Sequence, residues 1–200
     1  MFQAVILLGM DEAIYDAKTF WELFVRRVQI SGDKKMLIDD SDRSLTFSEA
    51  KEKVEKTAAG FMELGVREGT PVTWVLPTRI ETIVTSLALS RIGAVQNPII
   101  HIYREREVGF CIRQTSSELV LVPGEWNGFD YQEMVRNSTA DIANPPKIVQ
   151  IYDNLPEGDP QNIPEENSSN SEEPIRWIYY TSGTTSNPKG AMHTDSTLIA

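Results

Sequence analysis

Short apolar runs alternate with amphipathic stretches through the middle of this chain, and that alternation constrains the fold more than any other feature. The runs are rich in β-branched and aromatic residues, as strands are, and the stretches carry apolar residues at helical spacing. Strands that are separated by helices pair in parallel through right-handed crossovers. The sequence therefore predicts an α/β fold, a layered αβ sandwich with a mostly parallel, doubly wound sheet. The predicted strands are 71–76, 94–97, 118–122 and 147–152, and the predicted helices between them are 79–91 and 104–114.

Two further helices are predicted ahead of the sheet, because two capping-box pairs occur there. Thr19 with Glu22, and Thr46 with Glu49, have the spacing at which two side chains satisfy the free backbone N–H groups of a helix start. The predicted elements are a helix that begins near residue 20, a small hairpin of 36–39 with 44–46, and a helix over 47–64 that Gly65 ends.

The charge and the cysteine count narrow the partners and the compartment. A formal net charge of −10 argues against nucleic acid or an anionic membrane as a partner. The single cysteine, Cys111, excludes an internal disulfide and fits a reducing compartment, so we expect the protein to be cytoplasmic. The two histidines and this cysteine lie far apart and give no zinc-ligand spacing. No apolar run is long enough to cross a bilayer, so no transmembrane segment is predicted.

Composition divides the chain into four parts. Residues 1–18 read as a flexible leader, because the apolar run at 4–8 is too short for a signal sequence or a membrane span. Residues 19–152 hold the predicted α/β part. Residues 153–174 are acidic and proline-rich and contain no Lys or Arg, and since such a stretch cannot bury a core we predict a solvent-exposed loop. Residues 175–200 hold a strand, a hydroxyl-rich loop and the start of a helix.

The loop in the last part is the strongest functional feature of the chain. Residues 180–190 read Tyr-Thr-Ser-Gly-Thr-Thr-Ser-Asn-Pro-Lys-Gly. A run typical of a buried strand precedes them, and the residues that follow could open a helix. Backbone N–H groups, a helix N-terminus and the Lys189 ammonium could then cradle phosphate together. A Walker A loop is rejected, because Pro188 and Gly190 occupy the positions of its second glycine and its Mg²⁺-binding hydroxyl.

The same residues resemble the signature of the adenylate-forming superfamily, which includes acyl- and aryl-CoA synthetases, luciferase and peptide-synthetase adenylation domains. Nine positions of the eleven-residue pattern agree. Ser186 stands where the family usually has glycine, at a cost of about 1 kcal/mol if that position needs positive φ. Beyond the pattern, Asp195 replaces the second histidine of a frequent His-Thr-His run and would bring negative charge near a polyphosphate. Weaker likeness extends through 45–49, 65–72, 91–98 and 103–107.

This resemblance implies a two-step reaction, in which a carboxylic acid attacks ATP to give an acyl-adenylate and pyrophosphate, and CoA then displaces AMP. It implies ATP, Mg²⁺ and CoA as cofactors and co-substrates, and a small-molecule carboxylic acid as the substrate. Thr184 would lie close to Mg²⁺, and His193 close to the substrate or nucleotide. The implied phosphate contacts are Thr181, Ser182, Gly183, Thr184, Thr185 and Lys189.

The resemblance covers only the N-terminal portion of a longer enzyme, since the family's other essential segments follow the phosphate loop in sequence. They include a lysine on a mobile C-terminal lid. We therefore expect no catalytic residue in this chain, no acyl-adenylate formation by it alone, and an uncovered apolar face. Two alternatives stay open: a truncated or degenerate nucleotide-binding module, and part of an adenylation domain that loads a carrier-protein thiol.

Other conspicuous side chains are interpreted structurally. Cys111 lies at helical spacing with apolar residues and is expected in the core rather than as a nucleophile. Trp74 and Trp177 lie in strand runs and are also expected in the core. Residues 104–107 alternate Arg and Glu and are predicted to form a solvated, mutually paired helix start.

Overall fold

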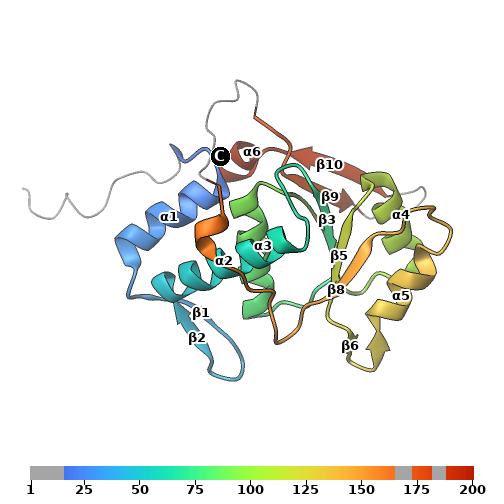
Figure 1. Cartoon of the computed structure of the whole chain (residues 1–200), viewed down its shortest axis with the longest axis horizontal. Coiled ribbons are helices and arrows are strands. Elements are labelled where there is room, and N and C mark those ends of the chain that lie inside the picture. Colours follow the sequence, from blue (N-terminus) through green and yellow to red (C-terminus); the bar gives the residue numbers. More distant parts are fainter. Residues whose placement is uncertain (1–15, 165–172, 182–187) are drawn as a thin grey trace, which may run out of the picture.

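The computed structural model describes residues 16–164, 173–181 and 188–200. Its centre is a six-stranded sheet with the strand order β10-β9-β4-β3-β5-β8 (Figure 1). Five strands of this sheet are parallel, namely β3, β4, β5, β8 and β9, and β10 runs antiparallel at one edge. The predicted α/β fold with a mostly parallel sheet is confirmed. The strands are β3 Pro71–Trp74, β4 Val95–Pro98, β5 Leu119–Val122, β8 Lys147–Gln150, β9 Trp177–Thr181 and β10 Lys189–His193.

Helices cover both faces of the sheet, because the central strands carry apolar side chains on both faces. On β5, Leu119 and Leu121 belong to one core cluster, whereas Val120 and Val122 belong to the other. Three helices supply the first cluster and two supply the second. Because both faces are buried, the strand is apolar at every position. The helices are α1 Phe20–Ser31, α2 Phe47–Glu63 and α3 Ile80–Ile92 on one face, and α4 Glu105–Thr115 and α5 Tyr131–Ser138 on the other.

The chain reverses its direction across the sheet beside β3, which makes the sheet doubly wound. It passes through α3 from β3 to β4, and then returns through α4 to β5 on the other side of β3. Ligands of such sheets bind beyond the carboxyl ends of the strands near a reversal of this kind. Since β9 lies parallel to β4, the residues that follow β9 lie at this same carboxyl edge.

The predicted helix starts and the small hairpin are confirmed. Thr46 accepts a hydrogen bond from Glu49 N at 3.2 Å, and the Glu49 carboxylate accepts one from Thr46 N at 2.8 Å, which completes a capping box. Thr19 accepts from Glu22 N at 3.0 Å and so caps α1 through its side chain. The hairpin pairs β1 Lys35–Ile38 with β2 Ser44–Thr46 in antiparallel fashion.

Between β5 and β8 the structure has three elements that the sequence analysis does not assign. A short hairpin turns at Asn127 and Gly128, which have φ values of 50° and 71°, as a tight two-residue turn requires. α5 then begins after Asp130, whose side chain accepts from two backbone N–H groups at 2.9 Å. Strands of two residues are too short to show a period. The hairpin consists of β6 Glu125–Trp126 and β7 Phe129–Asp130.

The segment after β8 packs more closely than predicted. Leu155 and Ile163 pack against the core cluster under α2, and Gly158 N donates to Lys56 O at 3.0 Å. A Cβ on Gly60 would lie 2.4 Å from the carbonyl carbon of Pro156, so only a glycine in α2 lets the segment approach. Most residues of 153–164 are exposed, as predicted, and its acids face outward, but Leu155 and Ile163 dock against the core. This stretch includes the 3₁₀ turn η2 Pro160–Asn162.

Three of the four predicted parts fall partly outside the described residues. These are 1–15 of the predicted leader, 165–172 of the predicted acidic loop and 182–187 of the last part. The described end of the leader belongs to the fold: Ala17 is buried, and Asp16 forms an ion pair with Arg26 of α1.

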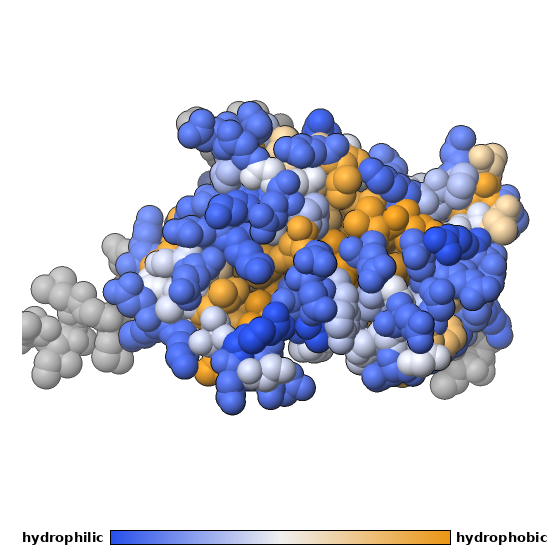
Figure 2. Space-filling model, turned by 60° about the horizontal axis from the view of Figure 1, so that its bottom comes forward, coloured by the Kyte–Doolittle hydropathy of each residue, from blue (hydrophilic) through white to orange (hydrophobic). Residues whose placement is uncertain are grey.

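Apolar side chains also reach the surface, and on the face seen in Figure 2 they gather into a band. The exposed large apolar side chains include Met192 at 67%, Ile102 at 60% and Ile100 at 52%. Such exposure is in line with the expected uncovered apolar face, and dye binding would measure it. Within 16–164, 173–181 and 188–200, no helix is both long and apolar enough to cross a membrane.

Candidate phosphate-binding site

The predicted phosphate loop is closed by a β-hairpin. Thr181 ends β9, Lys189 begins β10, and these two residues face each other in the antiparallel register. Directly opposed residues project their side chains to the same side of the strands, at Cβ separations of about 5 Å. A hydroxyl and an ammonium therefore stand together at the carboxyl edge of the sheet, both exposed to solvent. Ser182, Gly183, Thr184 and Thr185, including the predicted Mg²⁺ neighbour, lie outside the described residues.

A strand, and not a helix, follows this loop. The predicted helix over 191–200 is wrong in its first part, because 189–193 pair with 177–181 at every position. α6 Asp195–Ile199 begins only after Thr194, whose hydroxyl accepts from Thr197 N at 3.3 Å. At about 3.4 Å per residue, β10 itself spans roughly 14 Å, and that helix starts beyond its far end from Lys189. The helix N-terminus therefore does not form part of the phosphate cradle.

Gly190 has a packing role that the sequence analysis does not identify. It faces Tyr180 across the hairpin, and an added Cβ would lie 3.0 Å from Ile178 Cγ2 and 3.2 Å from Tyr180 Cζ. The tyrosine ring therefore covers the glycine, and its hydroxyl reaches Gln114 of α4 at 2.8 Å. Burial raises the pKa of Tyr180 to about 12, with a smaller contribution from Cys111. Lys189 thus supplies a positive charge, and Gly190 beside it leaves space for the Tyr180 ring.

His193 lies at the opposite end of β10 from Lys189. It faces Trp177, its ring meets the Tyr179 ring edge-on at 5.9 Å, and its Nδ1 is 3.4 Å from the Thr197 hydroxyl. It is therefore a strand residue and not part of a helix start. The structure does not bring His193 beside the facing pair of Thr181 and Lys189, and its proximity to a ligand stays a prediction.

Asp195 follows β10, at the opposite end of that strand from Lys189. It is 6% exposed, and its carboxylate accepts from Trp177 Nε1 at 2.7 Å and from Phe20 N at 3.0 Å. The whole length of β10 separates it from Lys189, so the structure does not bring its charge beside the facing pair, and its proximity to a polyphosphate stays a prediction. Its role is to join parts of the fold.

The electrostatics of the facing pair favour an anion. Lys189 enters none of the ion pairs formed among the described residues. Its exposed ammonium is available to a solute, and the neighbouring Thr181 hydroxyl can donate a hydrogen bond to the same solute. Nor do the described residues include a group of three His, Cys, Asp or Glu side chains that could hold a metal ion. This donor set suits a polyphosphate.

The side chains interpreted structurally lie largely as predicted. Cys111 is fully buried, and burial raises the pKa of its thiol to about 12, so it is a core residue. Trp177 is buried, and Trp74 is partly buried against the first core cluster. The predicted mutual pairing within 104–107 is not seen among the described ion pairs. Arg104 instead lies over the Phe129 ring at 4.3 Å and donates to two backbone carbonyls.

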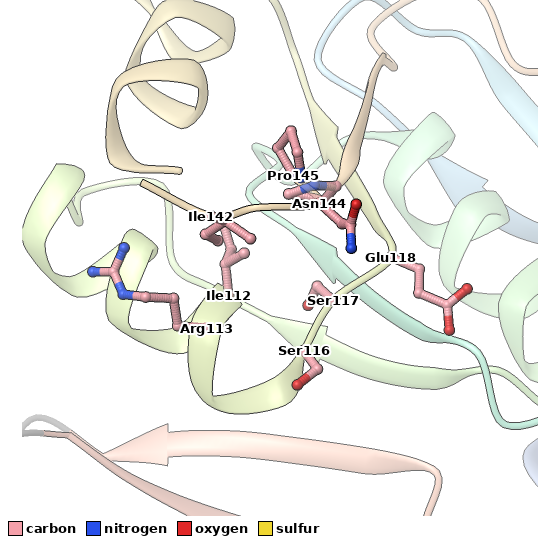
Figure 3. A pocket seen from close by; sticks show the side chains of 9 residues that line it. Ile112, Arg113, Ser116, Ser117, Glu118, Ile142, Asn144 and Pro145 are labelled. Carbon is pink, nitrogen blue, oxygen red and sulfur yellow. The ribbon is translucent and has the colours of Figure 1, made fainter. Parts of the chain in front are cut away.

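One hollow lies at the other edge of the sheet (Figure 3). It has a volume of about 380 Å³ and forms where α4 ends and where β5 and β8 begin. Since the facing pair stands at the carboxyl ends of the strands, this hollow belongs to a different region. Its walls include Ile112, Arg113, Ser117, Glu118, Ile142 and Pro145.

Comparison with known proteins identifies the family. The model of the AMP-binding enzyme family matches residues 24–200. This chain belongs to that family. It is similar to the acetyl-coenzyme A synthetase of Salmonella typhimurium, with 27% identity over 197 residues that cover 84% of this chain. It is also 26% identical over 174 residues to the hybrid PKS-NRPS synthetase apdA of Emericella nidulans, across 87% of this chain and 4% of that protein.

Solved structures of this family share the fold. The anthranilate CoA ligase AuaEII, in complex with anthranoyl-AMP, matches with a TM-score of 0.74 at 20% identity, over 90% of this chain and 36% of that one. The O-succinylbenzoate CoA synthetase of Bacillus subtilis, in complex with AMP, matches with a TM-score of 0.65 at 20% identity, over 88% and 42%. This AMP-binding family member spans about 30% of the length of the acetyl-coenzyme A synthetase that it matches.

Proposed function

We propose that this chain is the N-terminal part of an ATP-dependent carboxylic acid–CoA ligase, and that its β9–β10 hairpin binds the outer phosphates of ATP. The observation that carries the proposal is the facing pair of Thr181 and Lys189, at the carboxyl edge of a parallel sheet and at the two ends of the family's signature loop. Family membership and the likeness to acetyl-coenzyme A synthetase support it.

The chemistry assigned to the hairpin is charge neutralisation of a leaving group. An oxygen of the carboxylate forms a bond to the α-phosphorus, the bond between that phosphorus and the bridging oxygen breaks, and pyrophosphate leaves with the electron pair. Catalysis of this type rests on positioning and on stabilising the developing charge. The Lys189 ammonium would pair with the departing pyrophosphate, and hydroxyls from Thr181 to Thr185 would donate to its oxygens. Mg²⁺, when bound with ATP, would add positive charge there, with the Thr184 hydroxyl as its nearest proposed protein ligand.

The second step and the rest of the site are assigned to other parts of a longer enzyme. CoA would attack the acyl-adenylate through its sulfur and release AMP. We propose that the 200-residue chain by itself does not carry out either step, because a phosphate contact without groups for the adenine, the ribose and the acid cannot align the attack. The protein would be cytoplasmic, and its substrate would be a small-molecule carboxylic acid.

A second candidate is an adenylation domain that delivers its acyl group to a carrier-protein thiol. The match to a hybrid PKS-NRPS synthetase favours it. A non-catalytic nucleotide-binding module is the third. The coding sequence that follows Ala200 separates these candidates: an adjacent carrier domain supports the second, an immediate stop codon supports the third, and a continuing frame with a lid lysine supports the ligase.

The phosphate site can be tested on the chain as it is, by calorimetric titration with Mg²⁺–pyrophosphate and Mg²⁺–ATP. We expect Lys189→Met to weaken binding about 10- to 100-fold, because a charge-assisted hydrogen bond contributes about 1.5–3 kcal/mol. Lys147→Met is the matched control, since Lys147 is an exposed lysine that begins β8 at the opposite edge of the sheet. Equal binding by both variants and the wild type would refute the phosphate site.

Catalysis is tested separately by ATP–pyrophosphate exchange. The 200-residue chain should give only background exchange with any carboxylic acid, and a longer product that contains the missing segments should exchange with its own acid. Turnover by the short chain well above background would contradict the assignment of the essential groups to other segments.

A further inference from the structure

The β9–β10 hairpin pairs with the rest of the sheet only at its base, and nearer its loop Tyr180 contacts Phe110 and Gln114 of α4. β3 and β4 pair at four positions, but β9 pairs with β4 at one position, Gln96 with Trp177. Gln96 N donates to Arg176 O at 2.7 Å at this same point. Beyond Trp177 no further described position of the hairpin pairs with β4, while its own two strands pair at five positions. The hairpin is therefore one unit that meets β4 at its base and α4 through Tyr180.

A carboxylate fastens that base to a distant part of the chain. Asp195 accepts from the Trp177 indole at 2.7 Å through Oδ1 and from Phe20 N at 3.0 Å through Oδ2. The two donors belong to β9 and to the first turn of α1, and Figure 1 shows α6 beside that end of α1. The Phe20 ring also meets the Trp177 ring edge-on at 5.4 Å. We call these three residues, Asp195, Trp177 and Phe20, the clasp.

The clasp depends on a negative charge and not only on shape. Asp195 is 6% exposed and forms no ion pair among the described residues. A buried carboxylate without a cation is normally unfavourable. Here the start of α1 compensates, because Phe20 N is one of the free N–H groups of that helix and carries part of its positive end. Removal of the carboxylate would leave this N–H and the indole N–H without an acceptor.

The clasp and the facing pair stand at opposite ends of the same hairpin. Four residue steps separate Trp177 from Thr181, which is about 13 Å at the usual rise of a strand. A tilt of about 10° at the base would therefore move the far end by roughly 2 Å. Neither Thr181 nor Lys189 is paired with β4, so the base, together with the contact of Tyr180 with α4, sets where the hydroxyl and the ammonium lie relative to the carboxyl ends of the other strands.

We propose that Asp195 is a positioning residue of the phosphate site, which acts through Trp177 and the start of α1 to hold the β9–β10 hairpin at the angle that polyphosphate binding needs. This inference rests on the proposed function of that hairpin. It assigns a role to the residue in which the chain departs from the His-Thr-His run of the family it resembles. In this role Asp195 does not contact the ligand. Its substitution would weaken ligand binding indirectly, through a change in the orientation of the hairpin.

The test measures Mg²⁺–pyrophosphate and Mg²⁺–ATP affinity in three clasp variants of the whole chain. Asp195→Ala removes both acceptors, Trp177→Phe removes one donor and keeps an aromatic ring, and Asp195→Asn keeps one acceptor oxygen. We expect Asp195→Ala to weaken binding about 10-fold and the two milder variants to weaken it less, in proportion to the single hydrogen bond that each loses.

A destabilising variant away from the hairpin separates positioning from stability. Arg43→Gln breaks the contact of Arg43 with the buried Glu81, between the β1–β2 hairpin and α3. It should lower the melting temperature without changing pyrophosphate affinity at a temperature where circular dichroism shows every variant folded. If Asp195→Ala does not fold, Trp177→Phe and Asp195→Asn carry the same test.

The outcomes are distinguishable. Lys189-dependent binding that weakens in the clasp variants but not in Arg43→Gln supports the inference. Lys189-dependent binding that is equal to wild type in every folded clasp variant overturns the inference and leaves the phosphate site intact. Binding that weakens in Arg43→Gln as much as in the clasp variants reduces the effect to general stability and also overturns it. If Lys189→Met binds pyrophosphate as tightly as the wild type, the proposed phosphate site is refuted. The proposed role of Asp195 is then refuted as well.

Discussion

The centre of the sheet and the β9–β10 hairpin are built in opposite ways. β3 pairs with β4 at four positions and with β5 at three, Val72 and Trp74 pack in the first core cluster, and Val75, directly after the strand, packs in the second. β9 pairs with the sheet once, and β10 is an edge strand whose first four residues are exposed. The first region is held by burial along its whole length. The second is held by one paired position at its base and by the contact of Tyr180 with α4.

This difference separates what makes the fold stable from what gives it a site. Regions with few buried contacts and many exposed backbone hydrogen bonds open at a lower free energy than the core does. A substitution in the hairpin should therefore alter ligand binding with little effect on global unfolding, and a substitution in the centre should do the reverse. The three predictions below test that separation, in order of the expected change in stability.

The largest contrast is between two truncations of similar size, Leu89→Ala in α3 and Met192→Ala in β10. Leu89 is fully buried in the first core cluster, and Met192 is 67% exposed. We expect Leu89→Ala to lower the free energy of unfolding by about 2–5 kcal/mol, through lost burial and the cavity that remains. Met192→Ala should stay within about 0.5 kcal/mol. Urea denaturation followed by circular dichroism measures both.

A loss of more than about 1 kcal/mol in Met192→Ala would break the contrast. It would show that something covers β10 in solution, and self-association is the first possibility to check. The denaturation is therefore repeated at two protein concentrations, since a contribution from association depends on concentration and a contribution from intrachain packing does not.

The second prediction concerns a buried charge in the central region. Glu81 of α3 is 2% exposed and accepts from Arg43 at 2.7 Å, with Arg79 at 3.4 Å. Burial works to raise the pKa of Glu81, but the hydrogen bond from Arg43 and the charges of both arginines outweigh it, so the pKa lies below its usual value of 4.5. The carboxylate thus stabilises the fold above that usual value, and the contribution is lost as the pH falls through the lowered pKa.

We expect Glu81→Gln to lower the free energy of unfolding by about 1–2 kcal/mol at neutral pH, since Arg43 is half-exposed and regains hydration. The difference from wild type should shrink as the pH falls below about 4.5 and should vanish in stronger acid. Asp141→Asn is a suitable control, because its ion pair with Arg113 is exposed on both sides. A difference between Glu81→Gln and wild type that is independent of pH would contradict the assignment.

The same contrast explains which features could be predicted from the sequence. The central strands and their helices were predictable, because burial on both faces leaves apolar runs and capping boxes that can be seen in the residues alone, as at Thr46 and Glu49. The phosphate loop was predictable as a pattern. Its surroundings were not, since 191–193 carry no period that distinguishes an edge strand from a helix start, and it is pairing with 177–179 that decides.

The positions of Asp195 and of segment 153–164 depend on contacts with residues that are distant in sequence. Asp195 appeared to be a charge near a phosphate, yet its donors come from Trp177 and from Phe20, which lies 175 residues away in sequence. The acidic composition of 153–164 indicated a solvated loop, but a glycine in α2 at position 60 gives it a surface to lie on. Contacts of this range leave no local signal.

The third prediction sharpens the contrast inside the hairpin itself. Gly190→Ala places a methyl group 3.0 Å from Ile178 Cγ2 and 3.2–3.3 Å from the Tyr180 ring, so these neighbours must shift by a few tenths of an ångström. We expect a loss of at most about 1 kcal/mol in global stability, because overpacking here strains a partly exposed site and not a closed core. The more sensitive response is local. Burial is the main reason that the pKa of Tyr180 is raised to about 12, so a ring that moves outward should titrate closer to its usual value of 10.0.

Ultraviolet absorbance during an alkaline titration measures that change, and Tyr180→Phe identifies which of the six tyrosines is responsible. The shifted ring should also lose its hydrogen bond to Gln114, which ties the end of the hairpin to α4. If the ring holds the hairpin near its loop as the clasp holds its base, Gly190→Ala should weaken pyrophosphate binding while the urea midpoint barely moves. An unchanged titration together with a large fall in the urea midpoint would show the reverse, that the hairpin is as much a part of the core as β3.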